Sequence, residues 1–275
     1  MPYTESVVTF LDILGFGSLV SDEEQFEKIE RTLNRLQEWT QFEEFQTEGF
    51  EQRATNFSDC CVRSTPIVKS TGESNSFGIL AHEILDLVHA QLNLIGMESV
   101  LLRGAVTVGS LHHEEDQVFG PALVRAYYLE TDVAQYPRII VDPRLIHRMN
   151  STEDFVADQH DHDQERSHIA DCLKRDRDGI YFIDYLGLSA SELDDVPESV
   201  LFLQRHRDLI LAGAQTHGER PALAVKYNWL LEYHNDYVRT LNEDVLSEYD
   251  LDRDVFLIDE SNLPFYQKLG EQQRV

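Results

Sequence analysis

The segment SVVTFLDILGFGSLV, residues 6–20, most constrains how this chain can fold. The β-branched and aromatic residues from Val7 to Leu11 predict a buried strand, and Asp12 follows them directly. A carboxylate among apolar side chains is unfavourable unless it is paired, neutralised or bound to a cation. Two interpretations stay open on this segment alone: Asp12 caps the turn formed by Gly15 and Gly17, or it shares a site with a second carboxylate.

Length and charge narrow the classes of protein to consider. The 275 residues fit one large domain or a domain with an extension. No apolar run reaches the ~18 residues of a membrane span, and the N-terminus lacks a secretory pattern. Three cysteines cannot all pair within one chain, which favours a cytoplasmic location. A net charge of −27 argues against nucleic-acid and anionic-membrane partners, so binding of a polyphosphate would need a metal ion.

The hydrophobic pattern predicts an α+β fold in which helices cover one face of an antiparallel sheet. The polar stretch 150–178, which contains DQHDHDQERSH, is interpreted as a solvated loop because its spacing fits no metal-ligand pattern. Gly109 is expected to open a turn between two strands. The predicted strands are 51–58, 60–67, 101–108, 111–119, 138–141 and 180–186, and the predicted helices are 22–42, 76–94, one that starts at Gly120-Pro121, 192–216 and 220–241.

A second carboxylate, Asp59, lies in RATNFSDCCVRS between two predicted strands. A tight hairpin would place it at the edge of the sheet. With Asp12 and its glycine-rich turn, and with LLRGAVTVG and VFGPALVRAYYLE downstream, the order of motifs becomes specific. It resembles the class III nucleotidyl cyclase domain, and within that superfamily it looks most like the bacterial pyrimidine cyclases of Pycsar antiphage defence. The matching positions are Asp12-Ile13-Leu14-Gly15-Phe16, Ser58-Asp59, Arg103-Gly104, Gly109 and Gly120.

The resemblance implies a ferredoxin-like cyclase core over residues 1–190. The two helical patterns that follow predict a C-terminal helical extension, 191–275, packed on the same domain and compatible with the resemblance. The resemblance implies an enzyme that converts UTP to 3′,5′-cyclic UMP and pyrophosphate, as a second messenger in antiviral defence. It also implies a homodimer, in which one protomer supplies Asp12 and Asp59 and the other contributes from the helix after Gly120.

Metal and phosphate ligands follow from the same resemblance. Two Mn²⁺ or Mg²⁺ ions would be held by Asp12, Asp59 and the Ile13 carbonyl, because two carboxylates are the minimum bridge between two such ions. Backbone amides at the start of the first helix would cradle phosphate oxygens, and glycine lets the backbone come close. These amides belong to Leu14, Gly15, Phe16 and Gly17.

The sequence also departs from the purine cyclases of this superfamily. The transition-state Asn and Arg expected four and eight residues after Gly120 are replaced by Val124 and Tyr128. Arg125 is a candidate replacement, although a solvent-facing helical arginine explains it equally well. Arg103 is a second candidate, or a residue that pairs with a carboxylate in the sheet.

Base recognition departs as well. The positions that read the base in purine cyclases hold Thr55 and Gln117, which do not suit adenine. Gln117 can donate and accept hydrogen bonds, so it could face the polar edge of a pyrimidine, with Phe57 and Phe119 as walls of a smaller pocket. Plain solvent-facing strand positions remain the alternative for Thr55 and Gln117.

Three other functions remain open. A cyclase for CTP or for a purine needs only a different base pocket. A catalytically inactive cyclase-like domain that binds a nucleotide or a partner protein would explain the missing Asn and Arg. A dinucleotide synthase of the GGDEF type is disfavoured, because its signature turn is absent from the sequence. The adjacent His112 and His113 do not favour a metal site, because neighbouring strand residues point to opposite faces.

Overall fold

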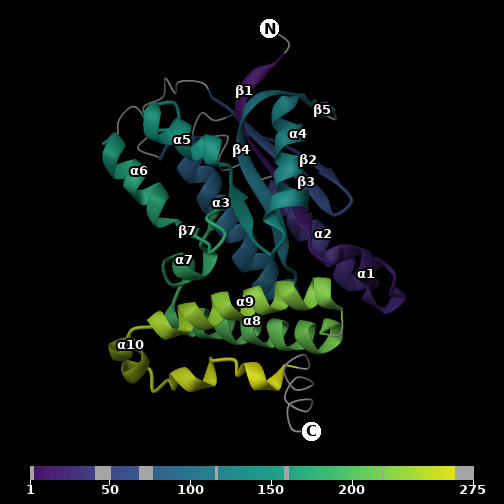
Figure 1. Cartoon of the computed structure of the whole chain (residues 1–275), viewed down its shortest axis with the longest axis vertical. Helices are drawn as coiled ribbons and strands as arrows, with labels where there is room; N and C mark the ends of the chain where they lie inside the picture. Colours follow the sequence, from purple (N-terminus) through teal and green to yellow (C-terminus); the bar gives the residue numbers. More distant parts are fainter. Residues whose placement is uncertain are drawn as a thin grey trace. The chain divides into compact units, whose positions relative to one another are not determined.

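The computed structural model describes residues 3–40, 51–67, 77–114, 117–157, 161–218 and 220–263 (Figure 1). The chain divides into two compact units. Unit 1 comprises Met1–Leu94 and Val100–Tyr185, and unit 2 comprises Ile95–Ser99 and Leu186–Val275. Across the described ranges, we find no helix with the length and apolarity needed to cross a bilayer.

Unit 1 is built on a mixed sheet in which most neighbouring strands are antiparallel. Its strand order is β2-β3-β1-β4-β6-β8-β7, β5 pairs with β4, and only the β4–β6 pair among the described strands is parallel. The predicted α+β class with a largely antiparallel sheet is therefore confirmed. The strands are β1 (Thr4–Ile13), β2 (Arg53–Phe57), β3 (Cys60–Pro66), β4 (Leu102–Glu114), β5 (Gln117–Phe119), β6 (Ile139–Val141), β7 (Leu173–Arg175) and β8 (Tyr181–Ile183).

Helices connect and cover these strands. Short 3₁₀ turns are η1 (Glu23–Gln25), η5 (Arg253–Val255) and η6 (Glu260–Asn262), and π-helical turns are η3 (Leu94–Glu98) and η4 (Leu129–Ala134). The α-helices are α1 (Phe16–Val20), α2 (Phe26–Thr40), α3 (Ile79–Asn93), α4 (Pro121–Tyr128), α5 (Pro143–Ser151), α6 (His162–Asp171), α7 (Tyr185–Glu192), α8 (Val196–His217), α9 (Pro221–Thr240) and α10 (Glu243–Glu248).

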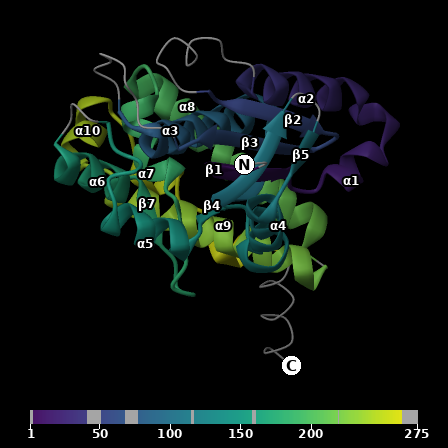
Figure 2. The ribbon, with the colours of Figure 1, turned by 90° about the horizontal axis from the view of Figure 1, so that it is seen from above.

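The two faces of the sheet are covered by different helices (Figure 2). Thr9 points to the face of α2 and α3, where its hydroxyl donates to Glu83 of α3. Val8 and Phe10 point the other way and pack with Ala122 and Ala126 of α4. The sequence predicted helices on one face of the sheet, which corresponds to α2 and α3. In the structure α4 also covers the opposite face. The site residues described below share the face of Val8 and Phe10, because Asp12 is two residues beyond Phe10.

Gly104 allows β1 and β4 to approach closely. A Cβ atom at this position would lie 2.6 Å from the carbonyl oxygen of Phe10, which is closer than a Cβ atom can approach a neighbouring atom without a shift. Only glycine fits there without moving the backbone. Gly104 of the Arg-Gly motif thus has a packing role. The close approach that it allows lets β4 pair with β1 in the register that places Arg103 opposite Asp12.

Two predicted elements differ in the structure. β4 continues through Gly109 to Glu114 and pairs with β5, which begins at Gln117, so the strand does not end at Gly109. The polar stretch 150–178 is not simply a loop, because it contains α6 and β7. The Asp161 side chain accepts from the amides of Asp163 and Gln164, and this cap starts α6. Ile169 then anchors the helix in the core.

Unit 2 is largely helical. α8 and α9 pack closely, and a Cβ atom at Gly213 of α8 would collide with the Tyr227 ring of α9. An extended C-terminal segment is held by the side chain of Asn235, whose amide donates to the Ile258 carbonyl at 2.8 Å and accepts from the Ile258 amide at 2.9 Å. The predicted helices at 192–216 and 220–241 correspond to α8 and α9.

Candidate metal centre

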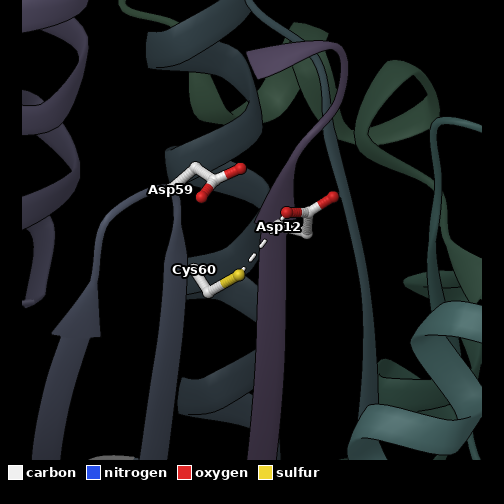
Figure 3. A group of neighbouring side chains, drawn as sticks. All are labelled: Asp12, Asp59 and Cys60. Atoms are coloured by element: carbon white, nitrogen blue, oxygen red, sulfur yellow. Dashed lines mark hydrogen bonds between the residues drawn. The ribbon is translucent and has the colours of Figure 1, made fainter. Parts of the chain in front are cut away.

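The structure brings Asp12 and Asp59 together at one end of the sheet (Figure 3). Asp12 is near the end of β1, and Asp59 lies in the turn between β2 and β3. Cys60, the first residue of β3, joins them, and one ligand atom from each of the three residues lies within 4.8 Å of the others. The three side chains form the Asp12–Asp59–Cys60 cluster.

Strand pairing explains why residues so distant in sequence meet. Phe57 pairs with Cys60, so only Ser58 and Asp59 form the turn of the β2–β3 hairpin. Cys60 in turn pairs with Asp12 across β3 and β1. Ser58 adopts a left-handed φ of 55°, which a two-residue hairpin turn favours. The turn therefore places Asp59 one residue from the partner of Asp12.

Arg103 and Glu130 surround Asp12 from the other side. Arg103 of β4 pairs with Asp12 in register, and its Nη2 lies 3.4 Å from Asp12 Oδ2. The same guanidinium forms a close ion pair with Glu130 of η4, whose side chain is buried. Asp12 and Arg103 are each about one-fifth exposed on their side chains. Arg103 is thus one cation beside three carboxylates, those of Asp12, Asp59 and Glu130. The Asp12–Asp59–Cys60 cluster therefore lies in a region with an excess of negative charge.

This charge excess and burial change the protonation of the cluster. Burial first, and then the neighbouring Glu130 carboxylate, raise the pKa of Asp12 from its ordinary 3.8 to about 6. Burial, followed by the charges of Asp12 and Asp59, raises the pKa of Cys60 to about 12. The Cys60 thiol accordingly keeps its proton and donates it to Asp12 Oδ1, with Sγ and Oδ1 3.5 Å apart.

The donor set fits a divalent cation. Carboxylate oxygens are the ligands that Mg²⁺ and Mn²⁺ prefer, and a cation would supply the positive charge that the cluster lacks. Asp12 and Asp59 are the residues that would hold it. This fit rests on the two carboxylates. The raised pKa of Asp12, caused first by burial and then by Glu130, is consistent with a site that gains from a bound cation.

The segment after Asp12 turns sharply into α1. Gly15 has a left-handed φ of 84° at the start of that helix, a conformation that favours glycine. The Ile13 amide donates to the Asp59 carbonyl at 3.2 Å, and the Leu14 amide donates to the Leu101 carbonyl at 2.9 Å. Of the four predicted phosphate-binding amides, that of Leu14 is therefore engaged in the fold. Those of Gly15, Phe16 and Gly17 lie at the helix start.

Arg125 is not a freely solvated side chain. Its guanidinium donates to Asp142 through Nε at 2.9 Å and Nη2 at 3.1 Å. Asp142 is fully buried and also accepts from the Thr107 hydroxyl. The structure thus pairs Arg125 with Asp142 and not with the metal cluster, while part of the arginine side chain stays exposed.

The two predicted base-reading residues lie near the β4–β5 hairpin. Thr55 of β2 hydrogen bonds through its hydroxyl to Nε2 of His113 at 2.8 Å, and the Nδ1 of this ring contacts the Ser64 hydroxyl at 2.7 Å. Gln117 is exposed and pairs with Glu114 across the hairpin. A surface hollow beside them is lined by Arg53, Ala54, His113 and Glu114.

Phe57 and Phe119, the predicted pocket walls, are exposed aromatic side chains. The His112 ring contacts the Phe119 ring at a tilt, whereas His113 is buried against β2 and β3, so the two histidines point in different directions as expected. Sequence reasoning missed Cys60 and Glu130 as neighbours of Asp12. Strand register would have indicated Cys60, once the two-residue turn had been fixed.

Comparisons with known proteins give a weak likeness. No protein-family profile and no curated sequence matches the chain. Two solved structures of a bacterial light-regulated adenylyl cyclase align at 12% identity with TM-scores of 0.34 and 0.35; the first alignment covers 61% of this chain and 57% of that one, the second 74% and 98%. The catalytic core of a rhodopsin-guanylyl cyclase with converted specificity, in complex with ATPαS, aligns at 14% identity with a TM-score of 0.35, covering 66% and 95%. Likenesses of this size do not place the chain in a family.

Proposed function

We propose that this protein is a nucleotidyl cyclase that converts a nucleoside triphosphate to a 3′,5′-cyclic monophosphate and pyrophosphate. The observation that carries the proposal is the pairing of Asp12 and Asp59 at one end of the sheet, directly before the glycine-rich turn into α1. In the reaction the ribose 3′-oxygen bonds to the α-phosphorus, and the bond to the leaving pyrophosphate breaks. The proton of the 3′-hydroxyl passes to solvent.

Each residue of the site has a distinct role in this proposal. Asp12 and Asp59 would hold two divalent ions, Mn²⁺ or Mg²⁺, together with the Ile13 carbonyl. Bound ions of this kind lower the pKa of the 3′-hydroxyl and neutralise the triphosphate. Glu130 anchors Arg103, and Arg103 orients Asp12. The amides of Gly15, Phe16 and Gly17 are the remaining candidates for contacts with phosphate oxygens.

A second protomer is part of the proposal. α4 and β5 expose several large apolar side chains on one stretch of chain, which is unusual for a surface that stays in water. In a homodimer this stretch would cover the site of the partner, and Arg125 would act across the interface. The exposed side chains are Phe119, Val124, Tyr127 and Tyr128.

Mixing two inactive variants tests the shared site. Asp59→Ala removes a metal ligand, and Arg125→Lys keeps a cation beside Asp142 but loses the planar fork of donors. Random pairing makes half of the dimers mixed, each with one intact site of two, so we expect about a quarter of wild-type activity. Activity is measured after the variants are mixed and allowed to exchange. A mixture no more active than its components contradicts a shared site.

We infer that the base is a pyrimidine, with UTP preferred over CTP. Thr55 is bonded to His113, and the exposed Gln117 pairs with Glu114, which lines the hollow. The Gln117 amide can donate and accept, so it can match the O4 or N4 edge of a pyrimidine. The purified protein is incubated with each of the four nucleoside triphosphates and Mn²⁺, and the products are identified by mass. ATP as the best substrate would leave only the broader cyclase proposal.

Gln117→Ala should reduce discrimination among bases more than it slows the best substrate. A site that hydrogen bonds a base edge rejects the wrong base because buried polar groups are left unpaired. The ratios of kcat/KM for UTP, CTP and ATP measure this. Gln164→Ala, on the exposed surface of α6, is the control. An unchanged ratio in Gln117→Ala would remove Gln117 from the base site.

The cellular role is proposed from the sequence motifs: a cytoplasmic second messenger made in response to phage infection.

One observation favours an alternative function of another class, an inactive domain that binds nucleotide. The engagement of Arg125 by Asp142 leaves no arginine of α4 free in the isolated protomer, as expected for an inactive domain that binds nucleotide. Nucleotide binding by calorimetry, with no cyclic product from any triphosphate, would support that alternative.

A further inference from the structure

Cys60 adds a second kind of donor, a thiol, to the two carboxylates. Its Sγ lies 3.5 Å from Asp12 Oδ1, and Asp59 completes the group within 4.8 Å (Figure 3). Cys61 and Cys172 are buried, whereas Cys60 is partly exposed. A thiol beside two carboxylates is not needed by a cation that prefers oxygen, so its chemistry points to a different class of metal ion.

The placement of this thiol follows from the backbone. Cys60 faces Asp12 because the two residues are register partners on β3 and β1. Cys61 is the next residue along β3, points to the opposite face and is completely buried. The pair Cys60-Cys61 therefore contains one thiol at the cluster and one in the core, and only the first can reach a cation bound there.

We propose that Asp12, Asp59 and Cys60 form a three-ligand site for a thiophilic divalent cation, of which Zn²⁺ and Cd²⁺ are the representatives. The proposal rests on the proposed metal site, whose two carboxylates it shares. On binding, the S–H bond of Cys60 breaks, its proton passes to solvent and a sulfur–metal bond forms, with no change of oxidation state. A water molecule completes four-coordination.

The geometry of the cluster suits such an ion. A tetrahedral centre with a Zn–S distance of about 2.3 Å and a Zn–O distance of about 2.1 Å has an S···O edge of about 3.6 Å. The Sγ–Oδ1 distance between Cys60 and Asp12 is 3.5 Å, so these two donors stand at the separation required before any ion binds. Asp59 lies in the hairpin turn, with a carboxylate oxygen within 4.8 Å of the other two donors, and a turn of its side chain would bring it to the third corner.

The two classes of cation then exclude each other. Mg²⁺ requires near-octahedral oxygen ligands and leaves the thiol protonated. A thiophilic ion recruits Cys60 and takes Asp12 and Asp59 with it, so the carboxylates are no longer available to the ions of the proposed reaction. The site is thereby inhibited by zinc-class ions through a ligand that belongs to this chain.

Cadmium titration of the full-length protein tests the ligation directly. Cd²⁺ bound to a thiolate gives a charge-transfer band in the ultraviolet, which carboxylate ligands do not give. We expect the wild-type protein to develop this band at one equivalent and Cys60→Ser to lose it, with Cd²⁺ affinity by calorimetry weakened at least about 10- to 100-fold. Asp12→Asn should keep the band but need more Cd²⁺ to reach it.

The serine variant retains Cys61 and Cys172, which serve as built-in controls. A band of full intensity in Cys60→Ser would assign the thiolate to one of them and overturn the proposal, as would a wild-type protein that binds Cd²⁺ without the band. The measurement is independent of turnover. If the band appears but no cyclic nucleotide is formed, the thiol ligand is supported and the proposed reaction is refuted. If cyclic nucleotide is formed but no band appears, the reaction is supported and the thiol ligand is refuted.

Discussion

Replacing Asp12 with asparagine should abolish turnover and at the same time stabilise the metal-free protein. Loss of a residue that only supports a metal ligand lowers activity by about 10- to 100-fold. Loss of a ligand itself should cost more, so we expect the rate to fall by at least about 100-fold. Stability rises because burial and the Glu130 carboxylate raise the pKa of Asp12 to about 6, so the ionised form is unfavourable in the folded state. The gain in unfolding free energy at neutral pH is on the order of 1–3 kcal/mol.

The pH dependence gives the sign of this effect. A carboxylate with a folded pKa above its ordinary 3.8 binds its proton more tightly in the folded state. The wild-type protein therefore loses stability as the pH rises from about 4 to about 6, and the asparagine variant is spared that loss. Thermal melting of the two proteins without metal, across this range, measures the difference.

Asp132→Asn is the matched control, because Asp132 is an exposed carboxylate on η4, close to Glu130 in sequence. It should leave turnover and melting nearly unchanged. If Asp12 were only a structural partner of Arg103, its removal would lower the melting temperature. A less stable but active Asp12→Asn variant would therefore refute the metal site.

Local patterns in the sequence predicted the positions of Asp12 at the end of a strand and of Asp59 in a hairpin turn. The apolar run before Asp12 and the short segment around Asp59 are each interpretable from a few neighbours, since a strand and a tight hairpin are determined by adjacent residues. The fold class followed because the order of strands and helices left few arrangements for an antiparallel sheet.

Features that depend on long-range pairing were not predictable in the same way. β4 passes through Gly109 because β1 pairs with it as far as Thr4 and Leu111, and that support is invisible in a local pattern. α6 was missed because its residues are almost all polar. Its stability comes from the Asp161 cap and from the burial of Ile169, which a search for hydrophobic periodicity does not weigh.

The neighbours of Asp12 show the same limit at the site. Arg103 was recognised as a residue that could pair with a carboxylate in the sheet, and the structure supplies two, Asp12 and Glu130. Glu130 belongs to a π-helical turn, whose irregular spacing no helical pattern predicts. For Arg125 the deciding partner, Asp142, caps α5, which follows α4 after η4 and β6.

Replacing Arg63 with methionine should strongly destabilise unit 1. Arg63 of β3 is fully buried between Glu83 and Asp86 of α3, with Nη2 3.1 Å from Glu83 Oε2. The Trp39 ring of α2 lies against the guanidinium, 4.2 Å from its centre. Without the arginine, two carboxylates stay buried with no cation, a change that costs about 3–5 kcal/mol. Chemical denaturation of the full-length protein and of Arg63→Met measures this loss of unfolding free energy.

The charge count around Arg63 makes the prediction specific. Glu83→Gln leaves one cation and one anion, Arg63 and Asp86, in close contact, and the amide can still accept from Thr9. It should therefore cost much less than Arg63→Met, although both remove the same ion pair. Adding Glu83→Gln to Arg63→Met should recover part of the loss, because fewer unpaired charges remain. Arg239→Met, at an exposed ion pair, should cost less than about 1 kcal/mol. Equal losses in Arg63→Met and Glu83→Gln would mean that packing, and not uncompensated charge, accounts for the stability of this cluster.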